Sequence, residues 1–220
     1  SPSFLWNAFL LEPVRQFAES LPAEQLEVVE HGAFFLVIMQ GFVQCVEVPA
    51  DNGSRLTLAV ISRLSCQRAG TRFLTRGIDD NGHVANFVES ETVLVEETCE
   101  DGEDGAEGDT NSDNTGNTVV NTFSYQILRG SVPLFWDQQG LQLGRPVFQI
   151  TRNAAATQPA FDRHFERLCG TYGLVHIVDL LGQRDGSAEE TLGSAYRLHV
   201  ERYPDPSALA LTQWDVNAVC

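Results

Sequence analysis

The sequence predicts an α/β fold with an α+β N-terminal part: a mixed β-sheet with β-hairpins, followed by βαβ parallel elements flanked by helices. Three observations lead to this prediction. Apolar residues have helical spacing near the N-terminus, β-rich runs then flank turn sequences, and after residue 150 strand and helix patterns alternate. With 220 residues, 43% of them hydrophobic, the chain is long enough to bury a sizeable core.

Two helices are predicted first. Residues 6–20 carry apolar side chains at helical spacing, namely Phe9, Leu10, Val14 and Phe17. Pro13 interrupts this pattern and is expected to kink or restart the helix. A second, short helix is expected to begin at Pro22, because proline suits the first helical position.

Two β-hairpins follow. Residues 34–48 and 56–61 are rich in β-branched and aromatic residues, and the turn sequence of residues 51–53 separates them. A second hairpin is predicted from two strands, with its turn at Asp79–Gly82; the strands are residues 72–78 and 84–95.

An acidic tract, residues 96–117, interrupts the β-rich region. It consists mainly of Asp, Glu, Gly, Asn, Ser and Thr, and cannot bury enough apolar surface to offset its ordering entropy. We therefore expect a disordered surface loop without a function of its own. Residues 119–128 resume as a strand, which should pair with the strand before the insertion.

The remaining elements alternate. Thr157 is expected to cap a helix over residues 158–168, which Gly170 or Gly173 ends. The apolar run 174–181 is typical of a buried parallel strand, and a capping-box sequence from Ser187 opens a helix to about residue 202. Residues 208–216 form the next strand, so a right-handed crossover and a parallel pair are predicted.

The charge of the chain narrows the classes of partner. The formal net charge is −16, which argues against a general binder of nucleic acid or anionic membranes. Residues 53–77, however, contain five arginines and no acidic residue. One guanidinium group can bind two phosphate oxygens at the same time, so this segment could bind phosphate. The five scattered cysteines fit neither a disulfide framework nor a zinc site, so a reducing cytoplasmic compartment is favoured.

Cys66 and Arg72 match the Cys-x5-Arg pattern of cysteine phosphatases, in which a thiolate attacks phosphorus. Phe73 follows where these enzymes usually place Ser or Thr, and no helix is predicted after the segment. We therefore interpret Cys66 as an accidental match. A self-contained cysteine phosphatase that uses Cys66 remains the discounted hypothesis.

An ordered series of motifs extends over nearly the whole chain. Its main members are Arg68-Ala-Gly-Thr-Arg72, Gly82-His-Val-Ala-Asn-Phe-Val-Glu89, Arg129-Gly-Ser-Val-Pro-Leu-Phe-Trp136 and Ala160-Phe-Asp-Arg-His-Phe165. In this order the motifs resemble those of the Sac-domain phosphoinositide phosphatases, and their residues are most similar to the synaptojanin type. Leu64 departs from the family, which usually has arginine in its Ser-Arg-Arg-Ser element.

The resemblance implies residues 1–50 as the end of an N-terminal Sac subdomain and residues 51–220 as the first half of the catalytic subdomain. The family's nucleophile lies in an Arg-Thr-Asn-Cys-x-x-Cys-x-Asp-Arg-Thr-Asn type loop, which does not occur before Cys220. No catalytic residue is therefore assigned within this chain. Phosphate-binding residues are predicted to be Arg68, Arg72 and Arg129. The alternative for these arginines is structural: they would bind backbone carbonyls, or pair with Glu89 or Glu91.

Two functions of different classes follow. The first is part of an enzyme that hydrolyses phosphate from the inositol ring of membrane phosphatidylinositol phosphates, inactive as this chain alone. The alternative is a non-catalytic lipid-binding or scaffold Sac module, which Leu64 and the absent loop suggest. Both imply a phosphoinositide headgroup as partner and a cytoplasmic location peripheral to membranes, with a role in endocytosis implied by the synaptojanin likeness. Neither a metal nor another cofactor is expected, and no transmembrane segment or nucleic-acid partner is predicted.

Overall fold

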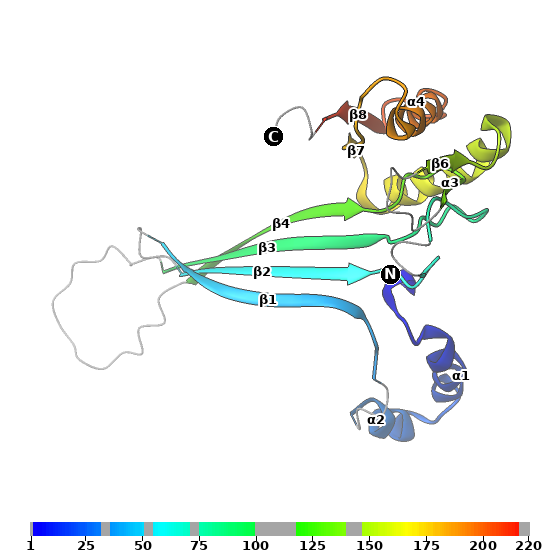
Figure 1. Ribbon diagram of the computed structural model, residues 1–220. Coiled ribbons are helices and arrows are strands. Elements are labelled where there is room, and N and C mark those ends of the chain that lie inside the picture. The colour runs from blue at the N-terminus through cyan, green and yellow to red at the C-terminus, as the bar shows by residue number, and fades with distance from the viewer. Residues whose placement is uncertain are drawn as a thin grey trace. The chain divides into compact units, whose positions relative to one another are not determined.

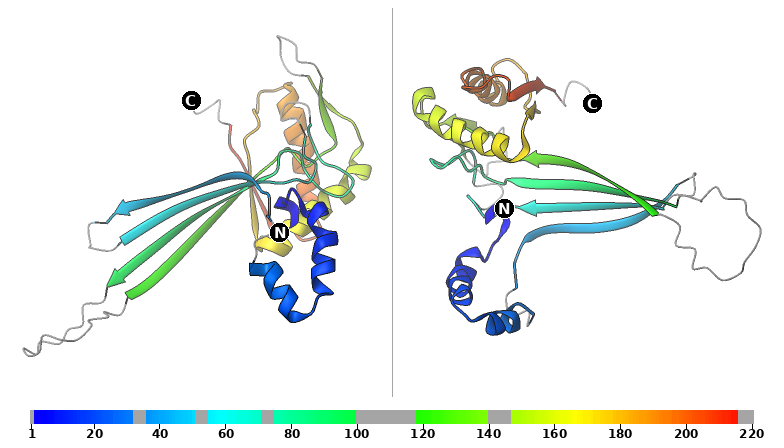
Figure 2. Two further views of the ribbon diagram at one scale, coloured as in Figure 1. Left: turned by 90° about the horizontal axis from the view of Figure 1, so that it is seen from below. Right: turned by 180° about the vertical axis from the view of Figure 1, so that it is seen from behind.

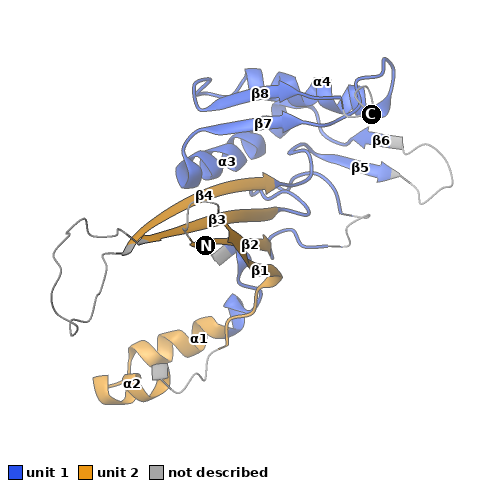
Figure 3. Cartoon of the chain, turned by 90° about the vertical axis from the view of Figure 1, so that its left-hand side faces the viewer, with its two compact units in different colours: residues 1–10, 65–87, 129–220 blue, residues 11–64, 88–128 orange. Residues whose placement is uncertain are grey.

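The computed structural model describes residues 2–31, 36–50, 55–70, 75–99, 118–139 and 147–215. The chain forms two compact units, both built from separate stretches of sequence (Figure 3). Unit 1 comprises residues 1–10, 65–87 and 129–220, and unit 2 comprises residues 11–64 and 88–128. The predicted Sac subdomain boundaries, which rest on resemblance, stay a prediction.

Unit 2 contains a four-stranded sheet in the order β1-β2-β3-β4 (Figures 1 and 2). The strands are β1 (Gln40–Pro49), β2 (Arg55–Leu64), β3 (Val88–Cys99) and β4 (Thr118–Arg129). The first three pair antiparallel, and the register places Ala59 between Cys45 and Val93. The first predicted hairpin and the pairing of the strands on both sides of the acidic tract are confirmed, although the turn at 51–53 lies outside the described residues.

Both predicted N-terminal helices are present: α1 (Ala8–Glu19) and α2 (Ala23–His31). Pro13 lies inside α1, which continues through it as one element. Pro22 precedes α2, and its carbonyl oxygen accepts hydrogen bonds from the amides of Gln25 (2.9 Å) and Leu26 (3.0 Å). Pro22 therefore precedes the helix as its N-cap, and the helix begins at Ala23, one position later than predicted.

Unit 1 contains the parallel pair β7 (Val175–Asp179) and β8 (Leu209–Gln213), joined through α4 (Ala188–Glu201). The 3₁₀ turn η1 (Pro2–Phe4), β5 (Trp136–Gln139), β6 (Val147–Ile150) and α3 (Ala154–Tyr172) complete the unit. Its core centres on the fully buried Phe161 and Leu192, with Phe165, Ile177 and Tyr196 packed around them. The predicted βαβ unit is confirmed, and the antiparallel hairpin of β5 and β6 is an addition to the prediction.

Three predictions for the strands and their connections differ from the structure. The second hairpin is reduced to a single bridge between Ile78 and Val84, because the segment around it bonds to other loops, and β3 begins only at Val88. β3 continues to Cys99, so the segment predicted to be disordered begins as a strand, and residues 100–117 lie outside the described residues. β7 buries Ile177 but exposes Val178, so one side of this strand is not covered by the described residues of unit 1.

Helix α3 begins earlier than predicted. Asn153 is its N-cap: its side-chain oxygen accepts a hydrogen bond from the Ala156 amide at 2.9 Å. Thr157, the predicted cap, lies one turn inside and donates its hydroxyl hydrogen to the Asn153 carbonyl oxygen. Gly173 ends the helix, as one of the two predicted alternatives stated.

The Asn153 cap gives a first testable prediction. Asn153→Ala leaves the Ala156 amide without its acceptor and is expected to lower the free energy of unfolding by about 1 kcal/mol. Asn153→Asp keeps a capping oxygen and should stay close to the wild-type value. Urea denaturation followed by circular dichroism measures both. Equal stability of Asn153→Ala and the wild type would contradict the assigned cap.

Candidate functional site

The predicted motif stretches meet in unit 1 around Gly77. The guanidinium group of Arg68 donates from Nε to the Gly77 carbonyl oxygen (3.2 Å) and from Nη2 to the Arg76 carbonyl oxygen (2.7 Å). Arg68 itself has a positive φ of 46°, which few non-glycine residues adopt. Its guanidinium therefore fixes the course of a neighbouring loop.

The segment that follows β4 lies against the same loop. Ser131 accepts a hydrogen bond from the Gly77 amide through its hydroxyl oxygen (2.8 Å) and donates its own amide to the Ala85 carbonyl (2.9 Å). The Ile78 amide donates to the Leu134 carbonyl at 2.9 Å. These bonds join the stretch around Arg68, the stretch around Asn86 and the stretch after Arg129 into one assembly, which we term the motif cluster (residues 65–70, 75–87 and 129–136).

Gly77 is the tightest point of the motif cluster. Its φ is +69°, and a Cβ atom at this position would lie 2.3 Å from the Leu134 carbonyl oxygen. Asn86 also has a positive φ, 55°, and its side-chain amide donates to the Thr75 carbonyl at 3.2 Å. Both residues therefore shape the backbone of the cluster.

The predicted phosphate-binding arginines occupy different environments. Arg68 is half-buried and bound to carbonyl oxygens. Arg129 is exposed, and its side chain makes no hydrogen bond or ion pair with any residue that the structure describes. Arg72 lies outside the described residues. The motif cluster thus presents Arg129 as a cation available for a ligand.

Arg63, in unit 2, is the arginine that pairs with the acidic residues of the Asn-Phe-Val-Glu motif. Its Nη2 contacts the buried Glu89 and lies 3.9 Å from Glu91 Oε2. The structural alternative expected Glu89 or Glu91 to pair with Arg68, Arg72 or Arg129. The register of β2 and β3 places Arg63 directly opposite Glu89. Arg68 instead binds backbone carbonyls, which is the other form of the structural alternative, and Arg72 lies outside the described residues.

Cys66 lies at the edge of the motif cluster without the surroundings of a nucleophile. Its thiol donates to the Ser3 carbonyl oxygen at 3.2 Å, and its amide bonds to the same oxygen at 2.9 Å. The described residues between Gln67 and Phe87 contain no helix, so no helix N-terminus faces this sulfur. The thiol and the amide of Cys66 are both engaged by one backbone carbonyl, which supports the interpretation of an accidental match.

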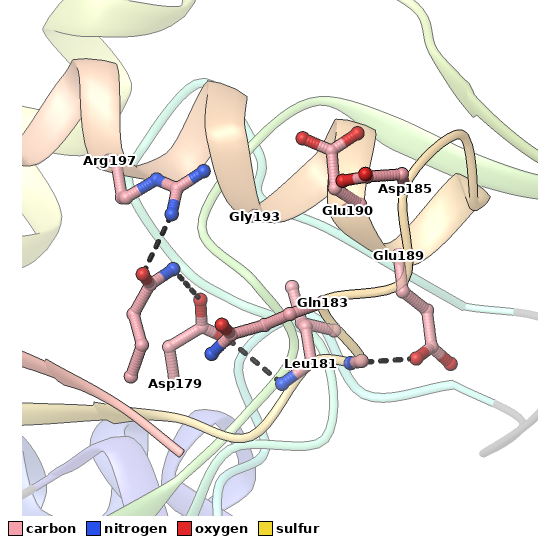
Figure 4. Close-up of a pocket in the computed structure, with 10 residues that line it drawn as sticks. Asp179, Leu181, Gln183, Asp185, Glu189, Glu190, Gly193 and Arg197 are labelled. Carbon is pink, nitrogen blue, oxygen red and sulfur yellow. Dashed lines mark hydrogen bonds between the residues drawn. The ribbon is translucent and has the colours of Figure 1, made fainter. Parts of the chain in front are cut away.

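A crevice of about 190 Å³ opens at the carboxyl ends of β7 and β8, beside the N-terminal part of α4 (Figure 4). Open parallel sheets commonly bind ligands at this edge. Asp179 and Gln213, the last residues of the two strands, face each other, with Gln213 Nε2 3.4 Å from Asp179 Oδ2. Arg197 donates to Gln213 Oε1 at 2.7 Å and to Ser194 Oγ at 2.7 Å.

The crevice is predominantly acidic. Four carboxylates and one guanidinium line it: Asp179, Asp185, Glu189, Glu190 and Arg197. Figure 4 shows Asp185 and Glu190 near each other and Arg197 apart from them. This charge balance disfavours a phosphate ligand among the described residues, so we do not place phosphate binding here. Asp215 borders the crevice, where its Oδ2 accepts the Gln183 amide at 3.2 Å.

A polar residue at the carboxyl end of a parallel strand is a candidate functional residue, and the predicted strand 208–216 places Asp215 in this position. Asp179 and Arg197 were not predicted. The rule that applied to Asp215, a polar residue at the carboxyl end of a parallel strand, applies equally to Asp179. Arg197 carries no comparable signal, because nothing in the sequence of α4 indicates which helical face meets the strand ends. Burial raises the pKa of Tyr196 in the adjacent core, and the charge of Asp179 adds to the effect.

Comparison with known proteins identifies the family. The SacI homology domain family matches residues 1–220. This chain is a member of the SacI homology domain family. This chain is 37% identical to inositol-1,4,5-trisphosphate 5-phosphatase 1 of Schizosaccharomyces pombe over 215 residues. The aligned region covers 98% of this chain and 18% of the relative.

Two further relatives are also similar to this chain over part of their length. Synaptojanin-1 of Rattus norvegicus is 40% identical over 158 residues (72% of this chain, 8% of the relative). Polyphosphatidylinositol phosphatase INP53 of Saccharomyces cerevisiae is 32% identical over 198 residues (90% of this chain, 15% of the relative). This chain therefore spans less than a fifth of the length of each of these relatives. The recognised synaptojanin-like family and the mixed α/β fold class are confirmed.

No group of three or more His, Cys, Asp or Glu side chains within the described ranges could hold a metal ion. Among the helices of those ranges, none is long and apolar enough to cross a membrane.

Proposed function

We propose that this chain is part of an enzyme that hydrolyses phosphate from the inositol ring of membrane phosphoinositides. The names of its relatives describe phosphatases of inositol phosphates and phosphatidylinositol phosphates. The observation that carries the proposal is the motif cluster, in which three separate family motifs lie together and leave Arg129 exposed. The reaction would take place at the cytoplasmic surface of a membrane, where such lipids are the substrate.

Within this proposal the arginines have different roles. Arg129 contacts a phosphate of the headgroup, because its fork of N–H donors is exposed and not engaged by described residues. Arg68 positions the cluster, since two of its nitrogens are already bound to the carbonyls of Gly77 and Arg76. Arg72 remains a proposed phosphate-binding residue from the family motif.

The nucleophile is not assigned to this chain. Cys66 donates its thiol hydrogen to Ser3, and no family-type nucleophile loop occurs in the sequence. We therefore expect the purified 220 residues to release no phosphate from phosphatidylinositol 4-phosphate, and Cys66→Ser to change nothing. Release of phosphate that Cys66→Ser abolishes would overturn this assignment.

A chimera tests the function itself. This chain replaces the matching segment of rat synaptojanin-1, and hydrolysis of a short-chain, water-soluble phosphatidylinositol 4-phosphate is measured. We expect activity, and Arg129→Gln should lower kcat/KM by roughly 10- to 100-fold, since a charge-assisted hydrogen bond to phosphate is lost.

The control for this experiment is Arg184→Gln. Arg184 is exposed, does not line the crevice and lies outside the motif cluster, so its loss should leave kcat/KM unchanged. A folded but inactive chimera would contradict the enzyme proposal and favour the alternative of a non-catalytic lipid-binding or scaffold module. Equal loss in both variants would contradict the role of Arg129.

A further inference from the structure

A second group of arginines surrounds the turn Asp79–Gly82, and none of them lines the crevice. Arg152 forms a two-pronged ion pair with Asp80, in which Nη2 lies 3.2 Å from Oδ2. Arg163 donates from Nη1 to the Asp80 carbonyl at 2.9 Å, and Arg167 donates from Nη2 to the Asn81 carbonyl at 2.6 Å. We call these three side chains, Arg152, Arg163 and Arg167, the arginine surface.

The guanidinium groups of the arginine surface are held in place by some of their N–H donors, while other donors stay available for a ligand. All three residues are exposed, and Arg163 Nη2 and Arg167 Nη1 make no hydrogen bond with any residue that the structure describes. Arg152 also stacks over Phe135, with its central carbon 3.7 Å from the ring centroid. Side chains that are already immobilised lose little entropy when they bind a ligand.

Charge is segregated around α3. Arg163 and Arg167 are four residues apart and share a helical face, which contacts the Asp79–Gly82 turn. Asp162 and Glu166 share the neighbouring face: Asp162 accepts from Gln158, which also bonds to α4, and Glu166 lies near Tyr203. The acidic residues of the helix therefore point toward α4 and Tyr203 and leave the arginine surface largely positive.

Asp80 is the carboxylate at the centre of this surface. Its hydrogen bond from Arg152 lowers its pKa, and the charges of Arg152, Arg163 and Arg68 act in the same direction. Asp79, the other acid of the turn, is occupied by the amides of Asn81 and His83 and by the His83 ring. Arg152 thus bonds to the exposed Asp80 carboxylate, while Arg163 and Arg167 bond to backbone carbonyls of the same turn. In this arrangement a phosphate oxygen could take the place of the Asp80 carboxylate at Arg152.

We propose that the arginine surface docks the protein on the phosphate groups of an anionic lipid bilayer, with the Asp80 carboxylate as an internal competitor for Arg152. The choice of a bilayer rests on the proposed function, which requires the enzyme to reach a substrate embedded in one. Because the chain as a whole carries a charge of −16, attraction to an anionic surface is confined to its few arginine-rich faces. Docking through this surface therefore also orients the molecule.

The test is sedimentation of the full chain with phosphatidylcholine vesicles that contain phosphatidylserine, at low ionic strength. Each arginine near an anionic surface is worth roughly a five-fold change in affinity, so Arg163→Gln with Arg167→Gln should weaken binding by roughly 20-fold. Asp80→Asn should strengthen binding several-fold, a change that loss of folding cannot imitate. Arg184→Gln, which removes the same charge from the loop between β7 and α4, should change binding by less than about two-fold.

Three results would overturn the docking proposal. The first is unchanged or weaker binding by Asp80→Asn, and the second is an equal loss in Arg184→Gln and in the double variant. The third is efficient release from vesicles by soluble inositol trisphosphate at equal phosphate concentration, which would assign the surface to a free headgroup. An active chimera with no vesicle binding refutes only the docking, whereas vesicle binding with an inactive chimera refutes only the proposed function.

Discussion

Gly77→Ala is expected to destabilise unit 1 by roughly 3 kcal/mol, since a positive φ and a steric overlap add together. The new Cβ would lie 2.3 Å from the Leu134 carbonyl oxygen and 3.1 Å from the Trp136 backbone nitrogen. Both contacts are with backbone atoms, which cannot rotate away as a flexible side chain would. The hydrogen bonds of Gly77 to Ser131 and Arg68 would be displaced with it.

Urea denaturation, followed through tryptophan fluorescence to which the buried Trp136 contributes, measures this effect. Gly186→Ala is the matched control, because Gly186 has nearly the same φ, +71°, but no atom within 4 Å of the added Cβ. Its expected cost is about 1 kcal/mol, from the backbone conformation alone. If the two variants lost the same stability, the close approach at Gly77 would be refuted.

Acid is expected to destabilise unit 1 through His164. Burial lowers the pKa of this histidine from 6.5 to about 4, while its hydrogen bond to the Gly82 carbonyl (3.0 Å) opposes the shift. In the unfolded chain the histidine takes up a proton near pH 6.5, whereas the folded chain resists protonation down to about pH 4. The stability contributed by neutral His164 is therefore complete above pH 6.5 and falls by roughly 3 kcal/mol as the pH drops to 4.

The measurement is the free energy of unfolding between pH 7 and pH 4, for the wild type and for His164→Gln. We expect a shallower pH dependence in the variant, whatever its absolute stability. His176→Gln is the matched control substitution, because it replaces an exposed histidine of the same unit. Parallel curves for the wild type and His164→Gln would contradict a buried neutral histidine.

The fold was predictable wherever short-range patterns decide it. Helical spacing placed α1, and the apolar run with its following capping sequence placed β7 and α4, where Ser187 accepts the Glu190 amide as expected. The hairpin at residues 72–95 was not predictable in the same way. Its strand-forming residues bond instead to a segment more than fifty residues away, through Ser131 and Leu134, and no local pattern reveals that choice.

The candidate site shows the same division. The three motif stretches were recognised from their residues, and the structure brings the described ones together around Gly77. The partner of Glu89, however, depends on the β2–β3 register, which places Arg63 opposite it. The arginine surface was missed because Arg152, Arg163 and Arg167 meet only through a turn distant in sequence, so that composition alone assigns them to a loop and a helix.

The way the chain passes between its units has a practical consequence for protein engineering. It crosses after residues 10, 64, 87 and 128, so no single truncation isolates either unit. On the unit 1 side the crossing points are tethered: Ser65 to Phe87 at 2.8 Å, Cys66 to Ser3 at 2.9 Å, and Ser131 to Ala85 at 2.9 Å. Short peptide linkers across these hydrogen-bonded points could replace residues 11–64 and 88–128 at a small entropic cost of loop closure. The resulting minimal protein would allow the phosphate-binding proposal to be tested without the sheet.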